Sequence, residues 1–222
     1  MIRSAALEQL AGWLTAVSLP HPLRVGIDGI DCAGKTSLAD ELAVLLTSQG
    51  HPVIRASIDG FHNPRAVRYR QGRTSPTGYY EDSFNLDSVL ACLLPPLGPG
   101  GDGRYKTAVF DHEHDTPINM AWQTAVCHAI LLLDGIFLHR PELLPHLDYS
   151  LFVNISFDTA LARAIHRDQR LLGSPERVTE LYQTRYFPAQ KHYLATCQPA
   201  QHANAVWQNN NLQQPVLHLK TP

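Results

Sequence analysis

The sequence predicts a doubly wound α/β fold around a mostly parallel sheet, and three observations support this fold class. Short, continuous apolar runs at residues 23–27, 129–133 and 151–155 are typical of strands that are buried on both faces. Segments with helical periodicity separate these runs along the chain. The first run enters a glycine-rich turn, and the second ends in Asp134-Gly135. We therefore expect three layers, α/β/α, with a ligand site at the carboxyl ends of the strands.

Helices and strands alternate through the first part of the chain. Residues 1–20 carry apolar side chains at helical spacing, which predicts an amphipathic N-terminal helix. Residues 35–48 repeat that period and are followed by Gly50, a residue that commonly ends helices. Residues 53–58 then predict a second strand of the sheet.

The rest of the chain adds a long loop, further helices and a last strand. Residues 60–83 are rich in Arg, Gly, Tyr and Pro without a sustained period, which predicts a long functional loop. A brief helix is expected at residues 87–94, and two more at 156–172 and 175–194. Residues 205–207 predict the last strand. We expect residues 1–222 to form one domain, because a chain of this length buries one substantial core.

Composition excludes several classes of partner. Lys and Arg number 18 against 20 Asp and Glu, so the net charge of −2 provides no global field for nucleic acid or a membrane surface. The four cysteines lie far apart without a C-x-x-C pair, which argues against a zinc ribbon or a disulfide framework. No segment approaches the roughly 20 apolar residues that span a bilayer. We therefore expect a cytoplasmic protein whose ligands are held by a local site.

The segment GIDGIDCAGKTS carries the pattern G-x-x-x-x-G-K-[ST] between a predicted strand and a predicted helix. Its glycines allow successive backbone N–H groups to converge on phosphate oxygens, and the following helix adds the positive end of its dipole. Lys35 would neutralise the β and γ phosphates of ATP, and Thr36 would ligate Mg²⁺. The nucleotide-binding residues predicted by this motif are Gly29, Asp31, Cys32, Ala33, Gly34, Lys35, Thr36 and Ser37.

Two further features predict parts of the same site. Asp134 closes an apolar strand, where its carboxylate can reach the metal, although Asp-Gly is also a common turn. Arg163, Arg167 and Arg170 recur at spacings of four and three on one predicted helix, so they share a face. That face is either a lid over the triphosphate or a solvated basic stripe.

Taken in order, these segments resemble the uridine kinase and phosphoribulokinase family of P-loop kinases. SIDGFH (57–62) is similar to its S-x-D-x-F-[YH] element, and LLLDGIF (131–137) to its L-x-x-[ED]-G-[IL] strand. RAIHRDQR (163–170) is similar to its arginine-bearing lid helix. ANAVWQNNN (203–211) is similar to a late segment near the adenine, with Asn204 where the family usually has aspartate.

The resemblance implies a kinase that transfers the γ-phosphate of ATP to a hydroxyl of a small metabolite, on a P-loop fold with a helical lid at residues 156–194. It implies that Asp59 is the general base, because a hydroxyl needs a proton acceptor to attack phosphorus. Lys35, Arg167 and Arg170 would stabilise the transferring charge, and Arg163 and Asn204 would lie beside the nucleotide. Self-association is one expectation from the resemblance; the sequence leaves the oligomeric state open.

The acceptor is less well specified than the chemistry. TGYYEDSFN (77–85) places Tyr79, and no carboxylate, where uridine kinases carry a sugar-binding aspartate. Arginines of the 60–83 loop could recognise an anion, and its tyrosines could stack on a base, while an ordinary solvated loop is the alternative. The acceptor-binding residues expected from the loop and from the resemblance are Phe61, His62, Arg68, Tyr79, Tyr80, Asp111, His112 and His114.

DHEHD, residues 111–115, admits three interpretations. On a strand, His112 and His114 would share a face and could bind a metal, but further ligands are not indicated. The resemblance favours an acceptor pocket, and a structural loop is the third interpretation.

For the chain as a whole, uridine or cytidine is the leading acceptor, with pantothenate, nicotinamide riboside or a sugar phosphate as alternatives. A nucleotide-driven switch or a non-catalytic ATP sensor is the alternative of another class, although the N-K-x-D string of GTPase switches is absent.

Overall fold

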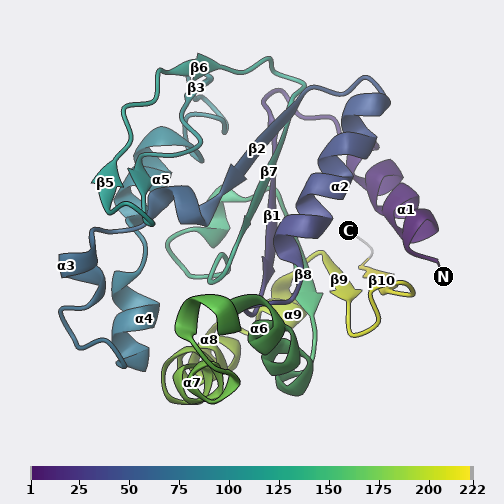
Figure 1. Ribbon diagram of the computed structural model, residues 1–222. Helices are drawn as coiled ribbons and strands as arrows, with labels where there is room; N and C mark the ends of the chain where they lie inside the picture. Colours follow the sequence, from purple (N-terminus) through teal and green to yellow (C-terminus); the bar gives the residue numbers. More distant parts are fainter. Residues whose placement is uncertain (1, 221–222) are drawn as a thin grey trace.

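A computed structural model describes residues 2–220, so residues 1, 221 and 222 of the predicted domain lie outside the described residues. Its centre is a six-stranded sheet in which five neighbouring strands run parallel and β10 runs antiparallel at one edge (Figure 1). In sheet order the strands are β10 (Val216–Leu219), β9 (Ala205–Gln208), β8 (Tyr149–Asn154), β1 (Leu23–Gly29), β7 (Ile130–Gly135) and β2 (Val53–Ser57). The predicted doubly wound, mostly parallel fold is confirmed.

Two hydrophobic clusters cover the two faces of the sheet, because side chains alternate along each strand. Leu132 of β7 packs in the cluster that contains α1 (Arg3–Thr15) and α2 (Lys35–Ser48). Its neighbours Leu131 and Leu133 pack in the other cluster, with α5 (Leu86–Cys92). The central strand is therefore buried on both faces, as its continuous apolar run predicts.

The segment from β2 to α5 differs from the predicted long loop. It contains a 3-10 turn, η1 (Ile58–Phe61), and two short helices, α3 (Arg65–Arg68) and α4 (Pro76–Asp82). Ser75 caps α4, since its hydroxyl accepts the amide hydrogen of Gly78 at 3.0 Å. Two small antiparallel strand pairs follow α5: β3 (Arg104–Tyr105) with β6 (Gln123–Thr124), and β4 (Phe110–Asp111) with β5 (Thr116–Pro117).

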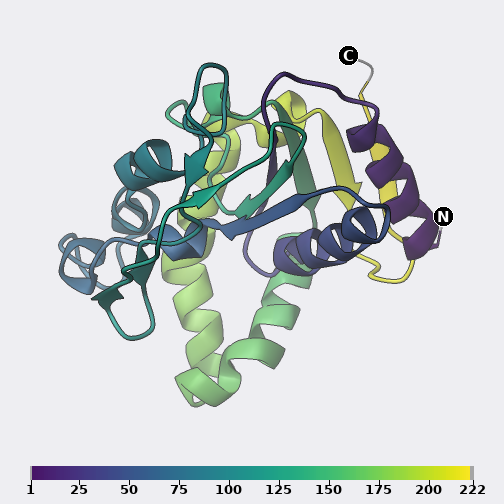
Figure 2. The same ribbon diagram turned by 90° about the horizontal axis from the view of Figure 1, so that it is seen from above.

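The predicted lid is a pair of helical arms that project from the sheet (Figure 2). The first arm is α6 (Phe157–Leu172), which ends at Gly173 with a φ of 93°. The second arm, predicted as one helix, is α7 (Pro175–Leu181), a π-helical turn η3 (Tyr182–Tyr186) and α8 (Phe187–Cys197). Pro188 accounts for the π turn, because in a regular α-helix it would lack an amide hydrogen to donate and its ring would clash with the carbonyl of Thr184 four residues earlier.

The remaining elements are the 3-10 turn η2 (Leu144–His146) before β8 and the short helix α9 (Pro199–His202) before β9. Among residues 2–220, no helix is both long and apolar enough to cross a membrane.

Candidate active site

The glycine-rich turn between β1 and α2 forms one wall of a cavity of about 480 Å³. Gly34 has a φ of 91° and precedes α2 with no side-chain cap, so the first amides of that helix are free for an anion. A Cβ at Gly29 would lie 2.5 Å from the carbonyl oxygen of Val153. Only glycine therefore allows the turn to leave β1 so close to β8.

Most of the predicted nucleotide-binding side chains face this cavity. Gly29 and Ala33 are buried and do not line it. Lys35 Nζ donates to the carbonyl oxygen of Ile30 at 2.9 Å, which holds the ammonium group inside the loop. The residues of the prediction that line the cavity are Asp31, Cys32, Gly34, Lys35, Thr36, Ser37 and Arg163.

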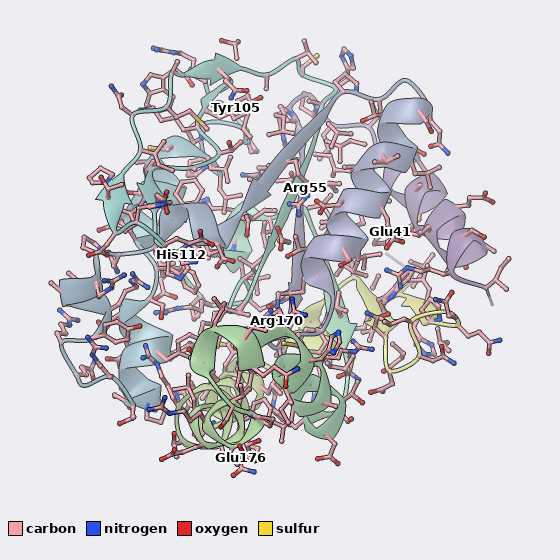
Figure 3. The ribbon with its side chains drawn as sticks, viewed as in Figure 1. Glu41, Arg55, Tyr105, His112, Arg170 and Glu176 are labelled. Atoms are coloured by element: carbon pink, nitrogen blue, oxygen red, sulfur yellow. The ribbon has the colours of Figure 1, made fainter. Side chains whose placement is uncertain are left out.

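Asp134 lies at the end of β7, directly beside the phosphate loop. Thr36 Oγ1 donates to its Oδ2 at 2.6 Å. Its Oδ1 is buried without a hydrogen bond to any residue from 2 to 220, although Nη1 of Arg55 lies 2.8 Å away. Figure 3 labels Arg55, which belongs to β2. Hydroxyl and carboxylate oxygens are the ligands that Mg²⁺ prefers, so the pair fits a Mg²⁺ site.

Asp59 lies in η1, immediately after β2, whose last residue Ser57 pairs with Asp134. Ser57 caps the turn by accepting the amide hydrogen of Asp59 at 3.3 Å. The Asp59 side chain lines the cavity and is 60% exposed, and its carboxylate makes no hydrogen bond to residues 2–220. Even so, the surrounding protein displaces enough water to raise the pKa of this carboxyl group.

The lid arginines divide into two groups. Arg163 and Arg167 line the cavity, whereas Arg170 lies exposed on α6 and does not line it. Arg163 donates to the carbonyl oxygens of Cys32 at 3.3 Å and Asn209 at 2.7 Å, which ties the lid to the phosphate loop. The structure thus does not bring Arg170 to the site, because the helix face that it shares with the others extends beyond the cavity.

Asn204 does not lie beside the nucleotide cavity, contrary to the prediction. It lies at the amino ends of β8 and β9, opposite the phosphate loop, where it accepts the amide hydrogen of Ser150 at 2.9 Å. Asn209, at the carboxyl end of β9, contacts the loop instead: its Nδ2 donates to the carbonyl oxygen of Ala33 at 2.7 Å. The late segment is therefore at the site, but through the residues that follow the strand.

Four of the predicted acceptor-binding residues line a second cavity of about 360 Å³, namely His62, Arg68, Tyr79 and His112. Tyr79, which stands in place of a carboxylate, donates its hydroxyl to Asp31 Oδ2 at 3.0 Å. Phe61 and Tyr80 do not line either of these cavities, because both pack in the apolar cluster under β7.

DHEHD is a turn between β4 and β5, so the strand assumed for its histidines is wrong. His112 lines the second cavity and stacks on His62 with 4.4 Å between the ring centroids. Asp111 and His114 do not line this cavity. Their side chains form a hydrogen bond to each other, with 2.7 Å between His114 Nδ1 and Asp111 Oδ2, and the His114 side chain is 76% exposed. Within residues 2–220, no cluster of three or more Asp, Glu, His or Cys side chains could hold a metal ion.

Four site residues escaped the prediction. Arg55 and Asn209 support Asp134 and the phosphate loop, as described above. Gln190 of α8 donates to Asp31 Oδ2 at 2.6 Å, and Arg185 of η3 lines the second cavity. Proximity to Pro188 could have drawn attention to Arg185, and Asn209 lies in the 203–211 segment that carries the family resemblance. The sequence carries no local signal for Arg55 or Gln190.

A parallel sheet with a phosphate loop, a carboxylate on the adjacent strand and a basic helical lid defines a P-loop kinase. The model of the phosphoribulokinase / uridine kinase family matches residues 25–212, and the chain belongs to this family. Membership places it among phosphotransferases that act on a hydroxyl acceptor.

Individual relatives agree with this assignment. The chain is similar to uridine-cytidine kinase B of Dictyostelium discoideum, with 26% identity over 78% of this chain and 70% of that protein. It is 30% identical to a uridine kinase of Saccharomyces cerevisiae over 66% of this chain, but spans only 29% of that protein. A solved structure described as a possible uridine kinase from Bacillus stearothermophilus has the same fold, with a TM-score of 0.73, 23% identity, and coverage of 91% and 97% of the two chains.

Proposed function

We propose that the chain, acting as one kinase domain, transfers the γ-phosphate of ATP to a hydroxyl group of a small metabolite, with Asp59 as the general base. The observation that carries this proposal is the position of the Asp59 carboxylate. It is free of hydrogen bonds to residues 2–220, and it faces the cavity that the phosphate loop also lines. A hydroxyl placed there can donate its hydrogen bond to Asp59 as it attacks the phosphoryl group.

The other residues of the cavity would hold and neutralise the nucleotide. Amides of the phosphate loop and Lys35 would bind the β and γ phosphates, and Arg167 would reach over them from α6. Thr36 and Asp134 would hold Mg²⁺, which supplies charge neutralisation for the phosphates when it is bound. Arg55 would fix the orientation of the Asp134 carboxylate.

Uridine and cytidine are the acceptors that the names of the curated relatives support. ATP-dependent ADP release, measured first without an acceptor and then with a panel of nucleosides, vitamins and sugar derivatives, tests the proposed reaction. A kinase responds to one class of acceptor. Equal ADP release with and without every acceptor would instead indicate a nucleotide-driven switch.

Asp134→Asn should lower the affinity for Mg²⁺ without unfolding the protein, because Arg55 keeps its ion pair with Asp40 at 2.9 Å. We expect the Mg²⁺ concentration for half-maximal binding of an ATP analogue to rise about 10- to 100-fold, the usual effect of losing a partner at a metal site. Calorimetry at several Mg²⁺ concentrations measures this, with the exposed Asp158→Asn as the matched control. An unchanged Mg²⁺ dependence would remove Asp134 from the metal site.

The raised pKa of Asp59 predicts a shifted acid limb in the pH profile. Only the deprotonated carboxylate can accept a proton, so kcat/KM should fall as the pH drops through a pKa above the ordinary range of aspartate. The pKa of Asp31 is also raised by burial, and both groups face the same cavity. Asp31→Asn should therefore keep the acid limb, and its disappearance in that variant would assign the limb to Asp31.

A further inference from the structure

The second cavity is where the phosphate acceptor would lie. It shares Asp59 and Arg167 with the nucleotide cavity, so a molecule bound there has one end at the general base. Its far wall comes from α3, from the π turn η3 and from the loop that carries His112. The charges on that far wall therefore bear on which acceptor the site prefers.

Arg185 is a buried cation without an acidic partner. Only 5% of the residue is exposed, and no carboxylate of residues 2–220 lies within ion-pair distance of it. One Nη donates to the carbonyl oxygen of Arg73, whereas Nε is buried without any acceptor in that range. A buried charge that lacks both a counter-ion and a full set of hydrogen bonds is costly, so it points to an anion from outside the chain.

Arg68, on the same wall, also has an unused donor. It is 9% exposed, and one Nη donates to His112 O at 3.2 Å and to Asp115 Oδ1 at 3.3 Å. Its Nε is buried and makes no hydrogen bond to residues 2–220. Asp115 is shared, because it also accepts the amide hydrogen of Arg65 at 2.7 Å. The acid beside Arg68 is therefore only partly available to it.

The acids that line the second cavity have other partners. Asp168 accepts from Arg167 at 2.6 Å and from the hydroxyl of Tyr182 at 2.8 Å. Asp31 accepts from Tyr79 and Gln190, as described above. Asp59 is shared with the nucleotide cavity, where the phosphoryl group would be transferred. None of these three lining carboxylates neutralises Arg68 or Arg185.

Arg185 lines the second cavity, and three tyrosine rings surround its guanidinium group. The π turn places Arg185 beside Tyr186, and π turns within helices often occur at functional sites. Its guanidinium carbon lies 4.7 Å from the ring centroid of Tyr69, 5.4 Å from that of Tyr79 and 5.7 Å from that of Tyr186. These rings stabilise the cation through their faces, but they do not satisfy its N–H groups.

We propose that Arg68 and Arg185 bind an oxyanion of the acceptor, so that the preferred substrate is an alcohol carrying a carboxylate or a phosphate and not a neutral nucleoside. This inference rests on the proposed kinase function. A guanidinium group matches the two oxygens of a carboxylate or phosphate with parallel hydrogen bonds. An acceptor anchored in this way at one end would present a hydroxyl to Asp59 at the other.

Matched pairs of acceptors test the substrate class. Glycerate against glycerol, ribulose 5-phosphate against ribulose, and pantothenate against its uncharged alcohol differ in the anion, and uridine and cytidine complete the panel. We expect ADP release with an anionic member and a much lower kcat/KM for its neutral partner. A highest kcat/KM for a neutral nucleoside would overturn the inference and leave the kinase function intact, whereas no response to any acceptor would count against both.

Arg185→Gln and Arg68→Gln test the two residues. Each should raise the KM of the anionic acceptor about 10- to 100-fold, the range for a hydrogen bond to a charged group, with the KM of ATP unchanged. Arg185→Lys should restore part of the loss by restoring the charge. Arg177→Gln, an exposed arginine of α7 that does not line the cavity, is the matched control. A rise in the KM of ATP instead would place these arginines on the nucleotide and overturn the inference.

A binding measurement checks the site independently of turnover. With the phosphate loop saturated by a non-hydrolysable ATP analogue, inorganic phosphate should raise the melting temperature of the wild type further. The Arg185→Gln variant should show little of this increase. An equal increase in both proteins, or none in the wild type, would show that Arg185 does not form an oxyanion site.

Discussion

Asp59→Asn should retain ATP binding and lose phosphoryl transfer. The amide has nearly the same shape as the carboxylate but cannot accept the proton, so kcat should fall by about 10²- to 10⁴-fold, the usual contribution of a general base. The dissociation constant of ATP should change little, because the phosphate loop and Lys35 are intact. Single-turnover kinetics and calorimetry with an ATP analogue measure the two quantities.

The matched control for this variant is Asp87→Asn. Asp87 is exposed in the first turn of α5 and lines neither cavity, so its replacement should leave kcat unchanged. The fold should tolerate Asp59→Asn equally well, because the side chain is 60% exposed and makes no hydrogen bond to residues 2–220. Turnover near the wild-type value in Asp59→Asn would remove this residue from the mechanism.

Gly29→Ala should damage both stability and nucleotide binding. Its methyl group would meet the carbonyl oxygen of Val153 at 2.5 Å, and the φ of 155° is unfavourable for alanine. Overpacking and backbone strain each cost about 1–3 kcal/mol, so we expect the free energy of unfolding to drop by at least about 2 kcal/mol. Relief of the clash would also move the phosphate loop, so the affinity for ATP should fall. Urea unfolding with and without an ATP analogue measures both effects.

Gly12→Ala is the control for this substitution. Gly12 lies inside α1, and a Cβ there would meet nothing within 4 Å. Alanine favours helix over glycine by about 0.5–1 kcal/mol, so this variant should be as stable as the wild type or more stable, with unchanged ATP binding. An equal free energy of unfolding for Gly29→Ala and the wild type would contradict the prediction. It would mean that β8 and the phosphate loop can move apart without a loss of stability.

The predictions from the sequence succeeded where the signal lies within a few consecutive residues. The continuous apolar runs identified β1, β7 and β8 as buried parallel strands, and the periodicity of residues 35–48 located α2 at the bounds that the structure has. The order of these elements also placed Asp59 and Asp134 at the same edge of the sheet as the phosphate loop. The roles of these residues remain predictions that the variants above can test.

The predictions failed where position depends on contacts between distant segments. Asn204 and Asn209 are five residues apart in the sequence, and only the pairing of β9 with β8 shows which one reaches the loop. Asp111 and His114 were expected in the acceptor pocket, but the turn that they close directs them outward. Arg170 shares a helix face with Arg167, yet the length of the cavity excludes it.

The sequence by itself determined the chemistry: a phosphate loop, the fold that presents it and a family of hydroxyl-directed phosphotransferases. These depend on local backbone geometry and on side-chain periodicity, which neighbouring residues encode directly. Only the tertiary structure decided which side chains form the wall of the acceptor cavity. Arg68 and Arg185 are 117 positions apart, and folding buries an Nε of each without a hydrogen bond to residues 2–220. Within those residues, Arg68 has only the shared Asp115 as an acidic partner and Arg185 has none.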